Sequence, residues 1–136
     1  MGGNLATNAG GKYLIKFGPL RGNITGMKVV LADGSVLDLS SKVRKNNSGF
    51  DLKQVFIGSE GLLGVITECN IHCAKKDTFK QIVFIKTNEF DTLLNIGIMA
   101  RNHFGTSLAA CEFMDKYAYS IVIQNMRNVI SPFEND

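Results

Sequence analysis

The segment at residues 2–11 constrains the fold of this chain more than any other. It reads GGNLATNAGG, with four glycines and two asparagines. Glycine-rich turns with small neighbours let backbone N–H groups approach an anion closely, as in phosphate-binding nests. We therefore expect a loop here that lies against a charged ligand. Because only Met1 precedes it, we expect the chain to begin inside a ligand-binding domain and to carry part of one site.

Glycine is unevenly distributed along the chain. Twelve of the fourteen glycines lie at or before Gly64. The first part is therefore rich in turns and short strands, whereas the second part has longer apolar segments. The change falls at the sequence KKD, residues 75–77. We predict a division into residues 1–76 and 79–136.

The first part contains a clear hairpin signal. Asp33-Gly34 separates two apolar runs, which predicts strands at 26–32 and 35–39 joined by a tight turn. Asp51 is a suitable cap for a short helix that runs through Phe56. A second glycine-rich loop follows at 57–64 and leads into a strand that starts at Val65.

The strand from Val65 alternates in character, which predicts a half-buried strand. One face carries the odd-numbered residues Val65, Thr67, Cys69, Ile71 and Cys73, and the other carries Glu68, Asn70 and His72. On a strand, Cys69 and Cys73 stand about 13 Å apart and His72 points away, so they cannot share a zinc ion. The chain has three cysteines. An odd number in a sequence with no readable secretory signal also argues against a disulfide framework. We predict no metal site.

The second part shows alternating strand and helix patterns. An apolar run predicts a strand at 79–86, and Asn88 is a candidate cap for a helix that extends to about residue 102. A second strand is expected at 107–114, and Asp115 is expected to open a helix through about residue 128. This β-α-β-α order is typical of a small α/β sandwich.

Charge excludes some classes of function. The net charge of +3 is mild, and the basic residues Lys42, Arg44 and Lys45 are not interleaved with aromatic residues, so nucleic-acid binding is not expected. These cations either form a solvated rim or face a phosphate. No apolar stretch approaches the roughly 18 residues of a membrane span.

No catalytic motif is readable. Ser59 lacks the flanking glycines of a G-x-S-x-G nucleophile elbow. Neither glycine loop matches a Walker motif or a dinucleotide-binding fingerprint. Two interpretations of the loops therefore stay open from the residues alone: both line one phosphate-bearing ligand, or both are tight turns. If they line one ligand, they should lie close together in the fold.

Five blocks of sequence carry a family resemblance. They are GNLATNAGG (3–11), KFG (16–18), GMKVVLADGSVL (26–37), RKNNSGFDL (44–52) and FIGSEGLLGVIT (56–67). In this order and spacing they resemble the FAD-linked oxidases and dehydrogenases of D-2-hydroxy acids, whose flavin domain is of the vanillyl-alcohol oxidase and p-cresol methylhydroxylase (PCMH) type. The block AACEFMD at 109–115 resembles the start of the substrate lobe in D-2-hydroxyglutarate dehydrogenases.

The resemblance implies an α+β fold. Residues 1–76 would be the C-terminal part of an FAD-binding domain with a mixed sheet and hairpins, and 79–136 the start of an α/β-sandwich substrate (cap) domain. It implies a mitochondrial flavoprotein oxidoreductase that oxidises D-2-hydroxyglutarate or D-lactate by hydride transfer to flavin N5, with an electron acceptor as second partner. The alternative is a truncated homologue without catalysis that binds protein, with actin as the named candidate.

The resemblance also assigns cofactor-binding residues. They are Gly3, Asn4, Thr7, Asn8, Gly10, Gly11, Glu60, Gly61, Gly64, Val65, Ile66 and Thr67. Two positions depart from many relatives, Phe50 in place of Tyr and Leu62 in place of Thr, and each lacks a hydroxyl. No catalytic or metal-binding residue of the family is matched in this chain, and neither is the family's first FAD loop. We therefore expect FAD in the full-length protein and none on this chain alone.

Gly64 has two competing explanations. If it lines a flat cofactor, Gly64→Val should abolish FAD binding more than it lowers stability. If instead it has positive φ, the substitution should lower folding stability whether or not flavin is present.

Overall fold

The computed structural model describes residues 1–41, 43 and 46–133. The chain divides into two compact units, Met1–Lys76 and Asp77–Asp136. We call them the first and second units and describe each by itself.

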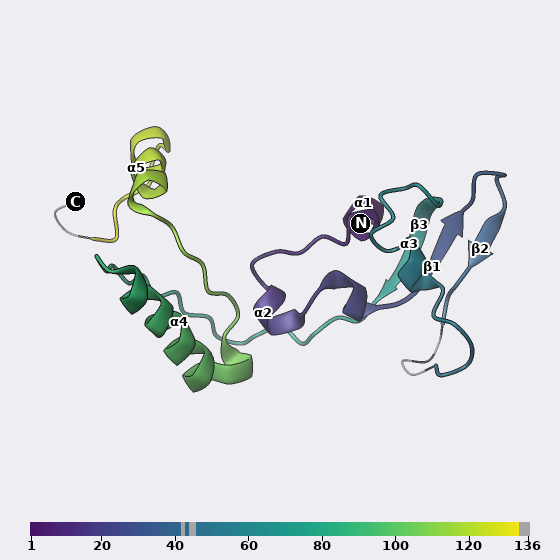
Figure 1. Ribbon diagram of the computed structural model, residues 1–136, viewed down its shortest axis with the longest axis horizontal. Coiled ribbons are helices and arrows are strands. Elements are labelled where there is room, and N and C mark those ends of the chain that lie inside the picture. Colours follow the sequence, from purple (N-terminus) through teal and green to yellow (C-terminus); the bar gives the residue numbers. More distant parts are fainter. Residues whose placement is uncertain (42, 44–45, 134–136) are drawn as a thin grey trace. The chain divides into compact units, whose positions relative to one another are not determined.

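A three-stranded antiparallel sheet organises the first unit (Figure 1). Its strands are β1 (Ile24–Val30), β2 (Val36–Asp38) and β3 (Val65–Ile71), in the order β2-β1-β3. The predicted hairpin is confirmed, because β1 and β2 pair directly. The sheet was expected to be mixed, but among the described residues its pairings are antiparallel, since a short hairpin and a long return loop connect the strands.

The first glycine-rich segment is not a loop throughout, which corrects the prediction. Residues Gly2–Ala6 form helix α1, although each glycine in a helix costs about 1 kcal/mol relative to alanine. Burial of Leu5, which is 0% exposed, offsets this cost. Asn8 ends the helix with φ of 49°. Its N–H donates to Leu5 O (3.0 Å) and Ala9 N–H donates to Asn4 O (2.8 Å), the two bonds of a Schellman motif.

Three short helical elements complete the first unit. They are α2 (Leu14–Phe17), η1 (Leu20–Asn23) and α3 (Lys53–Phe56). Asp51 does not cap α3 as predicted, since Leu52 is the N-cap residue and no side chain caps the helix. The Asp51 carboxylate instead pairs with the Lys53 ammonium, a charged partner that competes with the backbone N–H groups.

The core of the molecule lies where α1, α3 and the sheet meet. It is formed by Leu5, Ile24, Met27, Val29, Phe56 and Ile57. Ile57 brings the second glycine-rich segment onto this core. Burial of these side chains is the main favourable term that holds the segments in place.

Strand β3 does not keep one continuous face, which corrects the predicted alternation. The register of β1 against β3 shifts between Lys28 and Val29, so that Thr67 is skipped in the pairing. The extra residue of such a bulge moves the residues before it to the opposite face. Val65 is therefore 65% exposed, while Ile66 packs against the core.

The second unit is helical. It contains α4 (Phe90–Phe104), η2 (Gly105–Ser107) and α5 (Lys116–Asn125). Asp115 caps α5 as predicted, because its carboxylate accepts from Ala118 N–H at 2.7 Å. Asn88 is not the cap of α4. Glu89 is the N-cap residue, and its own N–H donates to Thr87 Oγ1 (3.2 Å).

The strands predicted at 79–86 and 107–114 are not formed in these described residues. Their apolar side chains remain exposed, for example Phe79 at 78% and Ile82 at 80%. A strand requires a neighbouring strand to pair its backbone groups, and the apolar run alone does not supply one. None of the helices in the described part of the chain has the length and apolar character needed to cross a membrane.

Candidate functional site

The two glycine-rich segments are in direct contact. We call residues 2–11 the first glycine segment and residues 57–64 the second. Gly58 N–H donates to Leu5 O at 3.0 Å, and Glu60 N–H donates to Ala6 O at 2.8 Å. The prediction that these segments lie close together, although they are far apart in the sequence, is confirmed.

The place where the two glycine segments meet is called the junction below. Arg21 of η1 contacts it. Its guanidinium Nη2 donates to Ile57 O at 3.0 Å. Gly58 has a φ of +83°, and a Cβ atom built there would lie 3.5 Å from Asn8 Cβ and 3.6 Å from Arg21 Nη2. Nothing in the sequence around Arg21 singles it out, because a lone arginine on a short turn gives no periodic or motif signal.

Two buried polar atoms belong to residues at this junction. Asn8 Oδ1 and Arg21 Nε are buried and have no hydrogen-bond partner among the described residues. A buried polar group without a partner costs about 1–3 kcal/mol. The junction therefore carries unused hydrogen-bonding capacity among the described residues.

Part of the glycine surface is open. A Cβ atom added at Gly3, Gly11 or Gly61 would meet nothing within 4 Å. Space of this kind beside the backbone suits a large flat or charged ligand, because no side chain holds it away.

Gly64 is different. A Cβ there would lie 2.7 Å from both Val29 Cγ1 and Val30 O, and φ is +156°. The close approach of β1 is therefore sufficient to require glycine at this position. Of the two explanations for Gly64, the structure favours the one in which substitution lowers folding stability.

The other predicted cofactor residues fall into separate environments. Thr7 Oγ1 donates to Gly3 O (3.0 Å) and Thr67 Oγ1 donates to Lys28 O (3.3 Å), so both hydroxyls are engaged within the fold. The side chains of Asn4 and Glu60 are exposed. Gly10 and Gly11 line a hollow of about 370 Å³ together with residues of α2.

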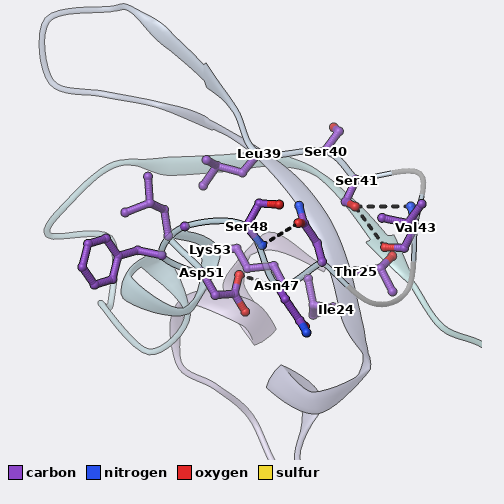
Figure 2. A pocket seen from close by; sticks show the side chains of 14 residues that line it. Ile24, Thr25, Leu39, Ser40, Ser41, Val43, Asn47, Ser48, Asp51 and Lys53 are labelled. Atoms are coloured by element: carbon purple, nitrogen blue, oxygen red, sulfur yellow. Dashed lines mark hydrogen bonds and ion pairs between the residues drawn. The ribbon is translucent and has the colours of Figure 1, made fainter.

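A larger pocket of about 600 Å³ lies in the first unit (Figure 2). It is lined by residues such as Thr25 of β1, Ser40 and Ser41 after β2, and Asn47 and Lys53. Lys42, Arg44 and Lys45, the basic residues for which a solvated rim and contact with a phosphate were both considered, lie outside the described residues. None of the predicted cofactor residues lines this pocket.

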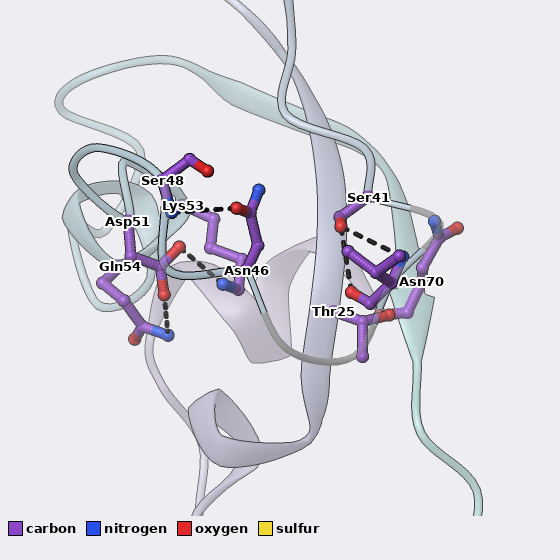
Figure 3. A network of polar contacts seen from close by, with 9 residues as sticks. Thr25, Ser41, Asn46, Ser48, Asp51, Lys53, Gln54 and Asn70 are labelled. Atoms are coloured by element: carbon purple, nitrogen blue, oxygen red, sulfur yellow. Dashed lines mark hydrogen bonds and ion pairs between the residues drawn. The ribbon is translucent and has the colours of Figure 1, made fainter.

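Local polar contacts order one wall of this pocket (Figure 3). Ser48 N–H donates to Asn46 Oδ1 at 3.0 Å, and Gln54 Nε2 donates to Asp51 Oδ2 at 3.3 Å. Phe50 and Leu62, the two positions that depart from many relatives, are 93% and 88% exposed. Among the described residues, no group of three or more His, Cys, Asp and Glu side chains is placed to hold a metal ion.

Among the described residues, three charged side chains of the β1–β2 hairpin have shifted pKa values. A hydrogen bond and the charge of Glu68 raise the pKa of Lys28. Hydrogen bonds from Ser35 lower the pKa of Asp33. Hydrogen bonds from Ser40 lower the pKa of Asp38 in the same way. These contacts stabilise the hairpin and strand pairing rather than the glycine junction.

Residues 1–40 match the FAD binding domain family. A probable mitochondrial D-2-hydroxyglutarate dehydrogenase of Oryza sativa subsp. indica is 40% identical over 132 residues, which cover 97% of this chain and 24% of the relative. The mitochondrial D-2-hydroxyglutarate dehydrogenase of Bos taurus is 46% identical over 122 residues, 90% of this chain and 22% of the relative.

A solved structure of an alkyldihydroxyacetonephosphate synthase also matches, with 35% identity and a TM-score of 0.42 over 50% of this chain and 12% of that protein. The chain spans about a quarter of the length of the curated relatives that it matches. Residues 1–40 are therefore similar to the FAD binding domain family, and most of the chain is similar to about a quarter of the length of the D-2-hydroxyglutarate dehydrogenases.

Proposed function

We propose that this chain supplies part of the FAD site of an oxidoreductase that oxidises a D-2-hydroxy acid, D-2-hydroxyglutarate or D-lactate. The observation that carries the proposal is the backbone contact between the two glycine segments, Gly58 N–H to Leu5 O and Glu60 N–H to Ala6 O. The first of these segments lies inside the region that matches the FAD binding domain family.

The residues at the junction fit this cofactor. The open positions at Gly3, Gly11 and Gly61 leave room for a pyrophosphate and a flat ring system. The buried atoms Asn8 Oδ1 and Arg21 Nε lack partners that a polar ligand can provide. Bound FAD would supply the hydride acceptor, at flavin N5, for oxidation of the substrate α-carbon.

The role of the chain's own residues is to bind and orient. The two glycine segments present backbone groups to the cofactor, and the buried side chains of Leu5 and Ile57 fix those segments to the core. The start of β3 follows the second glycine segment directly. There we propose that the cofactor is also lined by Val65, Ile66 and Thr67. We assign no catalytic base and no metal ligand to this chain.

The two units correspond to two parts of the proposed enzyme. We assign residues 1–76 to the C-terminal part of the FAD-binding domain and 79–136 to the start of the α/β-sandwich substrate lobe. The sequence identity to the relatives extends over both units, which supports the assignment of both units to one enzyme.

The relatives bear on location and on the alternative function. Several are named as mitochondrial enzymes, and we propose the same location for this protein, with a 2-hydroxy acid and an electron acceptor as its partners. The alternative of a non-catalytic module that binds actin receives no support from the comparisons.

The test uses the complete protein expressed from the full reading frame. We expect a yellow protein whose flavin absorption survives gel filtration. We expect the flavin to be bleached anaerobically by D-2-hydroxyglutarate or D-lactate and not by the L-enantiomer of either. A complete protein that folds but retains no flavin when FAD is supplied in excess would contradict the proposal. Bleaching by neither acid would contradict the substrate class.

A further inference from the structure

The peptide unit that joins Ile57 to Gly58 is held at both of its ends. Its carbonyl oxygen, Ile57 O, accepts a hydrogen bond from Arg21 Nη2 at 3.0 Å. Its N–H, on Gly58, donates to Leu5 O at 3.0 Å. One side of this single peptide plane is thus fixed by the arginine of η1, and the other by the first glycine segment.

The backbone at this peptide unit can rotate unless other contacts restrain it. Gly58 has a φ of +83°, and glycine enters this region and leaves it at little steric cost. Rotation of the peptide plane would turn Ile57 O toward Leu5 O and remove the hydrogen bond that joins the segments. A cationic donor on the carbonyl opposes that rotation, because charge-assisted hydrogen bonds are stronger than neutral ones.

Arg21 is itself held in place for this contact. Its neighbour Asn23 fixes the turn of η1, since Asn23 Nδ2 donates to Phe17 O (2.9 Å) and Pro19 O (3.3 Å). The side chain of Arg21 is partly buried, and its Nε atom is fully covered. A solvated surface arginine would leave its Nε in water. This one is packed against the junction.

We propose that Arg21 is a positioning residue that locks the Ile57–Gly58 peptide and so sets how the two glycine segments are placed toward FAD. The inference rests on the proposed function, because it takes FAD as the ligand of the junction. It adds a residue of η1, outside both glycine segments, that determines cofactor affinity without contacting the reacting atoms.

The experiment compares variants of the complete protein in the apo and FAD-bound forms. Arg21→Ala removes the donor, Arg21→Met removes it while keeping an apolar stem, and Arg21→Lys restores a cationic donor. Lys28→Ala is the matched control, because it removes one positive charge from a partly exposed pair with Glu68 on the sheet. The measurements are FAD dissociation constant, flavin midpoint potential, apo melting temperature and amide exchange at Gly58.

We expect Arg21→Ala and Arg21→Met to weaken FAD binding by about tenfold or more, the scale for loss of one charged hydrogen bond. Exchange at the Gly58 amide should be faster in the apo protein, and the midpoint potential of the remaining bound flavin should shift. Arg21→Lys should recover most of the affinity. Lys28→Ala should leave FAD affinity, Gly58 exchange and flavin potential as in the wild type.

The outcomes separate this inference from the proposed function. If the wild type binds FAD and Arg21→Met binds it equally well with unchanged Gly58 exchange, Arg21 does not position the junction. If the wild type binds no FAD, the proposed function fails, and Gly58 exchange in the apo variants still tests the peptide lock. Failure of both Arg21→Ala and Arg21→Met to fold would overturn the inference, since Arg21 would then be a requirement of the fold itself.

Discussion

At the residue scale, a glycine of the first glycine segment and one of the second serve different purposes. At Gly64 the added Cβ would overlap Val29 Cγ1 and Val30 O at 2.7 Å, whereas at Gly3 it would meet nothing within 4 Å. Interiors are close-packed, so the first position cannot accept even one carbon without movement of the backbone of β1. The second faces open space on a helix, where alanine is favoured over glycine.

Paired substitutions at these two positions are expected to have opposite effects. Gly64→Val should lower the free energy of unfolding of the apo protein by about 1–3 kcal/mol, the usual cost of overpacking. Gly3→Ala should raise it by about 0.5–1 kcal/mol through helix propensity, and should weaken FAD binding if the cofactor lies along α1. Urea titrations of the apo proteins measure the free energy of unfolding, and FAD titrations measure the affinity for the cofactor. Equal stability of Gly64→Val and wild type would contradict the close approach to β1.

At the element scale, the hairpin between β1 and β2 is stabilised by its own turn. Asp33 Oδ1 accepts from Ser35 N–H at 2.9 Å and from Ser35 Oγ at 2.6 Å. These bonds favour the charged carboxylate, which is why the pKa of Asp33 lies below its ordinary value. A group whose pKa is lowered by folding contributes stability above its unfolded pKa and loses it as the pH falls through the folded value.

The hairpin should therefore weaken below the ordinary pKa of an aspartate, 3.8. We expect the urea midpoint of the wild type to fall as the pH is lowered from about 5 through this value and further below it. In Asp33→Asn the part of the fall that Asp33 causes should be absent, because an amide does not titrate in this range. Asp115→Asn is a suitable control, since Asp115 caps α5 in the other unit. An identical pH dependence for wild type and Asp33→Asn would count against this assignment.

At the scale of the whole molecule, the buried residues in the described part of the chain lie in the first unit. The buried core residues all lie between Leu5 and Ile57, and among the described residues of the second unit none is buried. Helices α4 and α5 keep most of their apolar side chains accessible, for example Phe90 at 62% and Ile98 at 57%. The chain spans about a quarter of its relatives' length. The first unit is the part of it that contains a buried hydrophobic core.

This distribution leads to a prediction for the isolated chain. We expect the 136-residue protein to purify without FAD, because it matches about a quarter of its relatives and each 1.4 kcal/mol of lost contact lowers affinity about tenfold. The check is the visible absorption spectrum after gel filtration, with the complete protein as the positive control. A flavin band that remains with the isolated chain would show that the two glycine segments alone are sufficient.

The sequence by itself determined the local features that short-range chemistry controls. The Asp33-Gly34 hairpin and the Asp115 cap of α5 were predictable, because each depends on residues within a few positions of one another. The two glycine segments could also be identified as a pair, because their residue types and spacing resemble a known family.

Only the tertiary structure decided the features that depend on distant contacts. Burial of Leu5 turned a glycine-rich segment into α1, and the register shift beside Thr67 changed which face of β3 meets the core. The hydrogen bond from Arg21 to Ile57 O depends on a fold that brings η1 to the second glycine segment. Such contacts leave no periodic signal in the sequence, because packing between distant segments, rather than local propensity, sets their energy.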